Sequence, residues 1–305
     1  MRRFLEEEAR GKPVPKDWCY VTNFRDSYRP KVLSLPPGRG KELQTDMKGL
    51  VEGAQREISK AFESDEYAAR REETVKSFRQ QRDELFSRIN KRAQEENFSI
   101  QATPIGLMTL PLKDGKPLSD EDFQALSAEE QKEITDKRDQ LQDELKATFR
   151  QVQGIEKRIA EELKKVDHEV AHYVIDPLVE ELKETFHDQP EVVAYLEEVR
   201  TDIIENLGQF RQEEQERPAL PFPVPGPREM LFQKYEVNVL VDNAELAGAP
   251  VVMELNPTYN NLFGRIEKEA QFGALVTDFT MIRQGSLHRA NGGYLVLPVL
   301  EVLRN

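Results

Sequence analysis

The chain has 305 residues, of which 38% are hydrophobic and 32% charged, and its formal net charge is −13. This polar composition is typical of a protein with long exposed helices, and the acidic balance argues against a nonspecific grip on nucleic acid, which needs clustered lysine and arginine. The one cysteine, Cys19, excludes an internal disulfide framework, and no apolar run approaches the roughly 18 residues of a membrane helix. We therefore expect a cytoplasmic protein without a membrane or nucleic-acid partner.

Residues 1–40 are predicted to be the first part of an α/β domain. A short helix should end near Gly11, because two prolines follow it. The stretches DWCYVTNF (17–24) and KVLSL (31–35) are rich in aromatic and β-branched residues and are predicted to be strands. No N-cap precedes the first helix, so we expect the chain to begin within a domain.

Residues 41–216 are predicted to be a long helical insertion. Apolar residues recur at spacings of three and four from 41 to 97, which indicates one long amphipathic helix with coiled-coil periodicity. Residues 98–118 break this pattern and indicate a small β-hairpin. A second long helix should begin after the capping box of Ser127 to Glu130 and run to about Val174. The two long helices are expected to pack as an antiparallel pair, with shorter helices following over 177–212.

The remaining residues are predicted to return to α/β structure after a Pro-rich linker at 217–230. Strands are expected over 235–243, 250–255 and 292–300, and a helix over 262–270. An α/β module would then be split between residues 1–40 and 231–305.

Residues 168–172 read HEVAH and match the H-E-x-x-H signature of zinc peptidases. On a helix, His168 and His172 would share one face and could bind zinc, with Glu169 as the general base. The apolar stripe of this helix runs through other positions, so both histidines are expected to face solvent. No third ligand follows at a family spacing, and we keep a zinc peptidase as an alternative.

The segment PPGRGKEL (36–43) superficially matches a phosphate-binding loop. The pattern G-x-x-x-x-G-K-[ST] needs an opening glycine and a closing hydroxyl, but Leu35 and Glu42 stand at those positions. A turn that leads into a helix explains the segment better.

Two stretches near the end of the sequence carry a family resemblance. Residues 256–264 read NPTYNNLFG, and residues 285–293 read GSLHRANGG before the apolar run YLVL. Together with residues 17–43, they resemble the AAA+ module of Lon-like proteases, and the helical insertion resembles that of the Lon-related branch. The resemblance implies a predominantly α chain, in which a split α/β AAA+-like module carries a long antiparallel helical-hairpin (coiled-coil) insertion.

The resemblance also implies a substrate-gripping pore loop. Gln271, Phe272, Gly273 and Ala274 align with this loop of the family. An aromatic ring at such a place holds an extended chain by apolar contact without reading its sequence.

The Walker B acids of the family align with Pro298 and Val299. Neither side chain can hold Mg²⁺ through water or polarise a nucleophile. The family's P-loop would precede Met1, and its lid and Ser-Lys peptidase domain would follow Asn305. We therefore expect no catalytic residue, no metal and no cofactor in this chain, although the family uses ATP and Mg²⁺.

The expected function follows from the resemblance. The chain would be the non-peptidase portion of a Lon-like protease with weak or absent ATP hydrolysis. It would assemble with copies of itself as a ring, expected to be a hexamer, and pass unfolded proteins by Phe272 to the peptidase domain. A second alternative is a structural coiled-coil adaptor, whose α/β ends would not fold together.

Overall fold

The computed structural model describes residues 2–26, 28–103, 106–113, 115–211, 231–271 and 274–304. The linker predicted over 217–230 lies outside the described residues. The described chain is predominantly helical and forms two compact units, one of Met1–Phe62 with Ala171–Asn305 and one of Glu63–Val170. None of the described helices combines the length and the apolar character that a bilayer-spanning segment needs.

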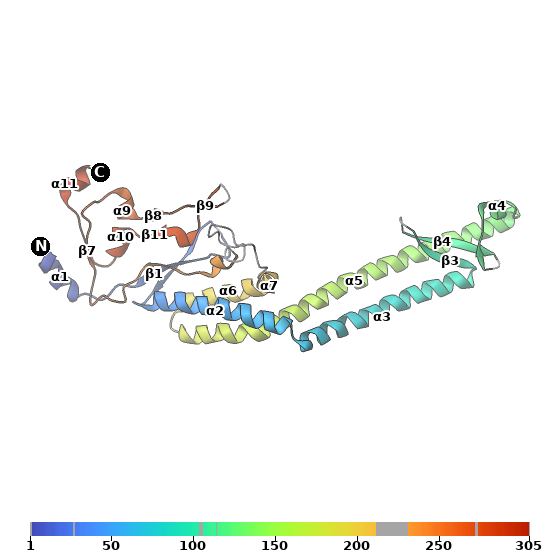
Figure 1. Ribbon diagram of the computed structural model, residues 1–305, viewed down its shortest axis with the longest axis horizontal. Coiled ribbons are helices and arrows are strands. Elements are labelled where there is room, and N and C mark those ends of the chain that lie inside the picture. Colours follow the sequence, from blue (N-terminus) through green and yellow to red (C-terminus); the bar gives the residue numbers. More distant parts are fainter. Residues whose placement is uncertain are drawn as a thin grey trace, which may run out of the picture. The chain divides into compact units, whose positions relative to one another are not determined.

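Both ends of the sequence contribute to one small sheet in the first unit (Figure 1). Its central strand is β1 (Asp17–Val21), which pairs antiparallel with β2 (Lys31–Leu35) and with β6 (Asn238–Val241). Alternate residues of β1 are buried, because successive side chains of a strand point to opposite faces. Helix α1 (Arg2–Arg10) joins the same unit, since the carbonyl of Ala9 accepts the N–H of Ala249 at 2.9 Å. The two ends therefore fold together, which argues against the adaptor alternative.

A layer of helices completes the core of the first unit. It comprises α2 (Arg39–Phe62), the C-terminal part of α5 (Ala128–Thr185), α6 (Pro190–Glu205) and α7 (Leu207–Arg211). The apolar faces predicted for α2 and α6 are buried, and they include Leu43, Met47, Leu50, Ala54, Ile58, Val192, Leu196, Val199 and Ile203. Each of these side chains except that of Ala54 contributes about 1.5–3 kcal/mol when it is fully buried.

The single long helix predicted for 41–97 is wrong, because the structure divides it into α2 and α3 (Asp65–Glu95). Ser64 has an extended backbone, and its side chain accepts the N–H of Tyr67 at 3.3 Å. Acidic residues follow directly in the first turn of α3. This is the N-cap arrangement that begins a new helix.

The predicted end of the second long helix is also wrong, because α5 continues through Pro177 to Thr185. A proline inside a helix leaves the carbonyl four residues earlier without its helical partner. That residue is Tyr173, whose side chain is 83% exposed. The interruption therefore falls on the solvent side of the helix, where the carbonyl is accessible to water.

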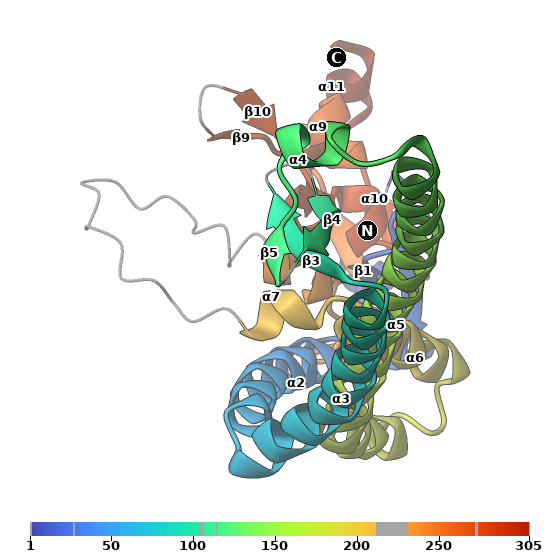
Figure 2. The ribbon, with the colours of Figure 1, turned by 90° about the vertical axis from the view of Figure 1, so that its right-hand side faces the viewer.

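The second unit consists of α3, the first part of α5, the short helix α4 (Asp120–Gln124) and a small sheet (Figures 1 and 2). The sheet has the order β3-β4-β5, with β3 at Phe98–Thr103, β4 at Gly106–Lys113 and β5 at Lys116–Pro117. Helices α3 and α5 contact each other near both ends of α3. Near the start of α3, the hydroxyl of Tyr67 donates to Asp167 Oδ1 at 2.6 Å, and near its end, Ala93 packs against Leu141. These contacts make the two helices antiparallel, whereas coiled-coil packing of their side chains stays a prediction.

The C-terminal segment of the first unit consists of short elements. They are η1 (Gln233–Tyr235), β7 (Val251–Met253), α9 (Tyr259–Phe263), β8 (Arg265–Ile266), β9 (Glu269–Gln271), β10 (Ala274–Val276), η2 (Phe279–Met281), β11 (Ile282–Arg283), α10 (Ser286–Arg289), β12 (Tyr294–Val296) and α11 (Val299–Arg304). The helix predicted over 262–270 is wrong, since α9 ends at Phe263 and strands follow. Gly264 ends it with a φ of 82°, a conformation that glycine adopts without strain.

Candidate functional site

The first candidate site is the carboxyl end of strand β12. This strand runs parallel to β7, and the N–H of Glu254 donates to the carbonyl of Val296 at 3.1 Å. After Leu297, the carbonyl of Pro298 accepts the N–H groups of Glu301 and Val302, both at 3.1 Å, and so starts α11. The side chain of Val299 is 68% exposed. The strand end thus passes directly into a helix, and Pro298 and Val299 place no side-chain oxygen there.

A carboxylate does lie beside this strand end, but it comes from the neighbouring strand. Glu254 follows β7, and its Oε2 accepts the hydroxyl of Ser286 at 2.6 Å, while its Oε1 accepts the N–H of Asn256 at 3.0 Å. Arg289 lies 3.6 Å from Oε2 and also donates to Ser286 at 2.9 Å. The Ser286 hydroxyl, the Asn256 N–H and the Arg289 charge hold the pKa of Glu254 below its usual value. Both oxygens of Glu254 thus accept hydrogen bonds that fix α10 and the loop after β7.

The segments NPTYNNLFG and GSLHRANGG pack against each other. Thr258 caps α9 by accepting the N–H of Asn261, and Asn261 in turn donates to the carbonyl of Asn256 at 2.8 Å. A Cβ atom added to Gly285 would lie 2.3 Å from the carbonyl oxygen of Leu262. The motif residues therefore build the loops around the β7–β12 strand pair.

The second candidate site is the hairpin of β9 and β10, which carries the predicted pore loop. The strands pair antiparallel, with Gln271 opposite Ala274, and Phe272 and Gly273 lie outside the described residues. Leu275 on β10 is 71% exposed. The described backbone thus brings Gln271 and Ala274 together, whereas the position of the aromatic ring stays a prediction.

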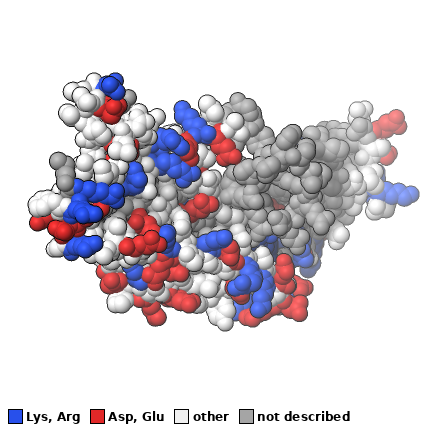
Figure 3. Space-filling view, turned by 60° about the vertical axis from the view of Figure 1, so that its left-hand side comes forward, with Lys and Arg blue, Asp and Glu red and all other residues white. Residues whose placement is uncertain are grey.

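Acidic and basic side chains near this hairpin form ion pairs with each other and do not cluster by charge. Glu267 lies between two arginines, with its carboxylate 2.8 Å from Arg265 Nη2 and 2.7 Å from Arg283 Nε. Both arginines lower the pKa of Glu267 through these hydrogen bonds. Basic and acidic side chains are interspersed on the face drawn in Figure 3.

The HEVAH segment lies within α5. His168 is half-buried, Glu169 is exposed, and the side chain of His172 is 46% exposed. His172 Nδ1 lies 3.2 Å from Asp176 Oδ1, one turn along the same helix. Among the described residues, no group of three or more histidine, cysteine, aspartate and glutamate side chains is placed to hold a metal ion.

The segment PPGRGKEL forms the start of α2, and an acidic side chain of the protein occupies that helix end. Asp17 is fully buried, and its Oδ2 accepts the N–H of Gly40 at 3.1 Å. Its Oδ1 accepts the N–H of Asn243, which follows β6, at 2.8 Å. The carboxylate thus takes the place that an anion prefers at a helix N-terminus, which leaves no room for a phosphate at Gly40. Sequence reasoning missed this residue.

Cys19 lies beside this buried carboxylate. Burial, with the negative charges of Asp17 and Asp242, raises the pKa of the Cys19 thiol to about 12. The thiolate is the reactive form, so we expect the folded chain to resist alkylation by iodoacetamide at pH 7.5 and to react only after unfolding. Because the folded thiol holds its proton more tightly than the unfolded one, stability should fall as the pH rises from 9 toward 12. Labelling measured by mass spectrometry with and without denaturant checks this, and rapid labelling of the native chain would contradict it.

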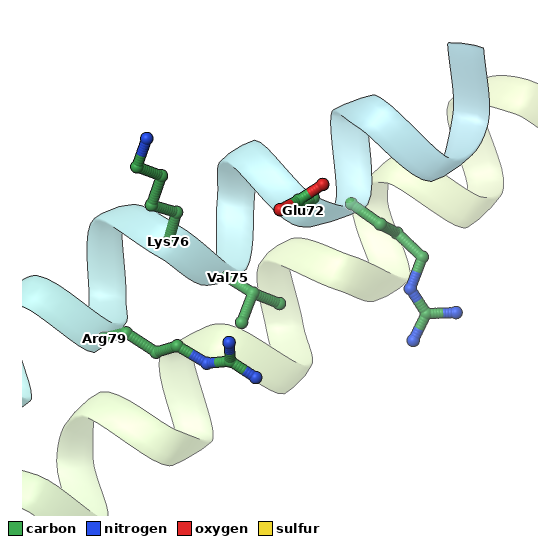
Figure 4. Close-up of a pocket in the computed structure, with 5 residues that line it drawn as sticks. Glu72, Val75, Lys76 and Arg79 are labelled. Atoms are coloured by element: carbon green, nitrogen blue, oxygen red, sulfur yellow. The ribbon is translucent and has the colours of Figure 1, made fainter. Parts of the chain in front are cut away.

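The second unit carries a shallow groove along α3 that the sequence did not indicate. It is lined by Arg71, Glu72, Val75, Lys76 and Arg79 (Figure 4). Figure 4 shows Val75 directed toward the neighbouring helix and Lys76 directed away from it. Long charged side chains around one apolar contact are typical of the surface of a packed helix pair. The groove is therefore not a catalytic candidate.

Two family models match the chain. Residues 247–305 match the LonB-like AAA domain, and residues 17–50 match the Lon-like LonC helical domain. These two segments of the chain are similar to Lon-like domains. The LonB-like AAA match covers β7 to α11, including both candidate sites, and the LonC match covers β1, β2 and the first half of α2. A search of curated proteins finds no significant match.

Proposed function

We propose that this Lon-like chain serves in ring assembly and in the gating and passage of unfolded polypeptides toward a Ser-Lys peptidase domain. Its ATP hydrolysis would be weak or absent. The observation that carries the proposal is the end of β12, where Pro298 and Val299 lead into α11. A helix start without side-chain oxygens supports a module that keeps its shape without holding a metal ion.

The surroundings of this strand end support an architectural role. Two residues of α10 bind Glu254 after β7: the hydroxyl of Ser286 donates to it at 2.6 Å, and Arg289 lies 3.6 Å from the same carboxylate oxygen. The β9–β10 hairpin lies between the two motif segments in the sequence, and these segments pack closely against each other. Close packing of the flanking segments suits a loop that holds a passing chain by contact.

The proposal predicts that the aromatic ring of Phe272 is needed for substrate passage. In the intact protein, Phe272→Ala should slow degradation of an unfolded protein such as reduced, carboxymethylated α-lactalbumin at least tenfold. Phe272→Tyr should keep most of the activity, because it retains the ring. Cleavage of a short fluorogenic peptide, which needs no gripping, should stay unchanged in both variants. Equal degradation of the unfolded protein by Phe272→Ala and wild type would refute the role of the loop.

A further inference from the structure

The two edges of the β3-β4-β5 sheet in the second unit differ in character. The β5 edge consists of Lys116 and Pro117, two residues that prevent further strand pairing at an edge. The β3 edge runs over six residues, FSIQAT, without a charge or a proline. In a chain with 32% charged residues, such a neutral edge is an open template for another strand.

The pairing register shows which backbone groups this edge offers. The N–H of Leu112 donates to the carbonyl of Asn97 at 2.7 Å, and hydrogen-bonded pairs then alternate along an antiparallel ladder. Ser99 and Gln101 therefore bond to β4, whereas the N–H and C=O groups of Ile100 and Ala102 point to the open side. Among the described strands, β3 pairs with β4 alone, so these outward groups of Ile100 and Ala102 have no strand partner there.

The strand is held in place from its packed face. Phe98 is 2% exposed and, with Ile100, packs against Ala93, Leu141 and Ile134. A backbone fixed in this way is already in the conformation that strand addition requires, which lowers the entropy lost on binding.

We propose that the free edge of β3 binds an extended polypeptide segment, which adds to the sheet as a fourth strand. Recognition runs through the backbone groups of Ile100 and Ala102 and so tolerates varied sequences. Because the edge carries no charge, it does not select a partner by the partner's charge. This property fits unfolded substrates of varied sequence better than one dedicated partner. The inference rests on the proposed function, in which the chain handles unfolded polypeptides, and it names a contact for them outside the pore loop.

The test uses the full chain and a dye-labelled ten-residue peptide of alternating Thr and Val with a lysine at each end. Fluorescence polarisation should show saturable binding to the wild-type chain. The same peptide with every second amide N-methylated should bind at least tenfold more weakly, because it cannot complete the ladder. The proposal would be overturned if the first peptide did not bind, or if both peptides bound equally well. This comparison uses the unmodified chain.

Matched variants test whether the peptide binds at the β3 edge. Ala102→Pro removes an outward N–H at an edge position where proline is tolerated, and it should weaken binding at least tenfold. Gln101→Ala alters an exposed side chain on the same strand and should bind like wild type. Unchanged binding by Ala102→Pro would overturn the proposal. The proposal would also be overturned if the chain associated with itself through this edge. In that case Ala102→Pro would abolish the self-association, and the peptide would not compete with it.

The outcome is separable from that of the proposed function. Peptide binding at β3 is measured on the chain itself, whereas the role of Phe272 is measured by degradation. A Phe272→Ala variant that degrades normally would refute the pore loop and leave the β3 result standing.

Discussion

Replacing the buried carboxylate of Asp17 by an amide should lower the free energy of unfolding by about 2–4 kcal/mol. Both Asp17 oxygens accept backbone N–H groups, from Gly40 at 3.1 Å and from Asn243 at 2.8 Å. In Asp17→Asn, one N–H of the new amide faces a backbone N–H, and a buried unsatisfied donor costs about 1–3 kcal/mol beyond the lost charge-assisted bond. Trp18, the only tryptophan, lies next to Asp17, so its fluorescence in a urea titration reports on this unit.

The matched control for Asp17 is Asp26→Asn. Asp26 lies in the exposed loop between β1 and β2 and accepts the N–H of Tyr28 at 3.1 Å. Asparagine keeps an oxygen for this bond, so the midpoint should move little. An equal, small effect of both substitutions would show that Asp17 does not hold the two ends of the chain together.

Gly285→Ala should destabilise the first unit by about 3 kcal/mol, the upper end of the usual range for overpacking. The added Cβ would lie 2.3 Å from the carbonyl oxygen of Leu262 and 2.4 Å from the N atom of Gly264. Both are backbone atoms, so relief requires moving α9 away from α10, and overpacking of this kind typically costs about 1–3 kcal/mol. Trp18 contacts the ring of His288 on α10, and its fluorescence should change as the contact is lost.

Gly49→Ala is the control for the glycine substitution. Gly49 lies in the interior of α2, and an added Cβ meets no atom within 4 Å. Alanine should stabilise the helix there by about 1 kcal/mol. A destabilising Gly49→Ala together with a neutral Gly285→Ala would contradict the packing of the two motif segments.

The sequence predicted those elements whose signal is local. The apolar faces of α2 and α6 followed from spacings of three and four, and β1 and β2 from their β-branched and aromatic residues. The break at Ser64 was missed because its cap lies in a stretch otherwise rich in helix-forming residues. The end of α9 depends on the positive φ of Gly264, which apolar periodicity does not show.

The contacts around the candidate sites were not predictable, because their partners are distant in the sequence. Asp17 meets Asn243 across 226 residues, and Glu254 meets Ser286 across 32. No local sequence pattern predicts that a carboxylate will bind a residue so distant in the sequence. The Walker B position was located by resemblance alone, and the structure adds that Pro298 begins a helix there.

The central claim is that this Lon-like module is kept for its architecture and not for nucleotide hydrolysis. The most direct measurement is Mg²⁺-dependent ATP turnover by the intact protein, with and without unfolded substrate. We predict a rate close to that of the protein-free control, together with degradation that does not require ATP. Robust Mg²⁺-dependent hydrolysis that supports degradation would contradict the account.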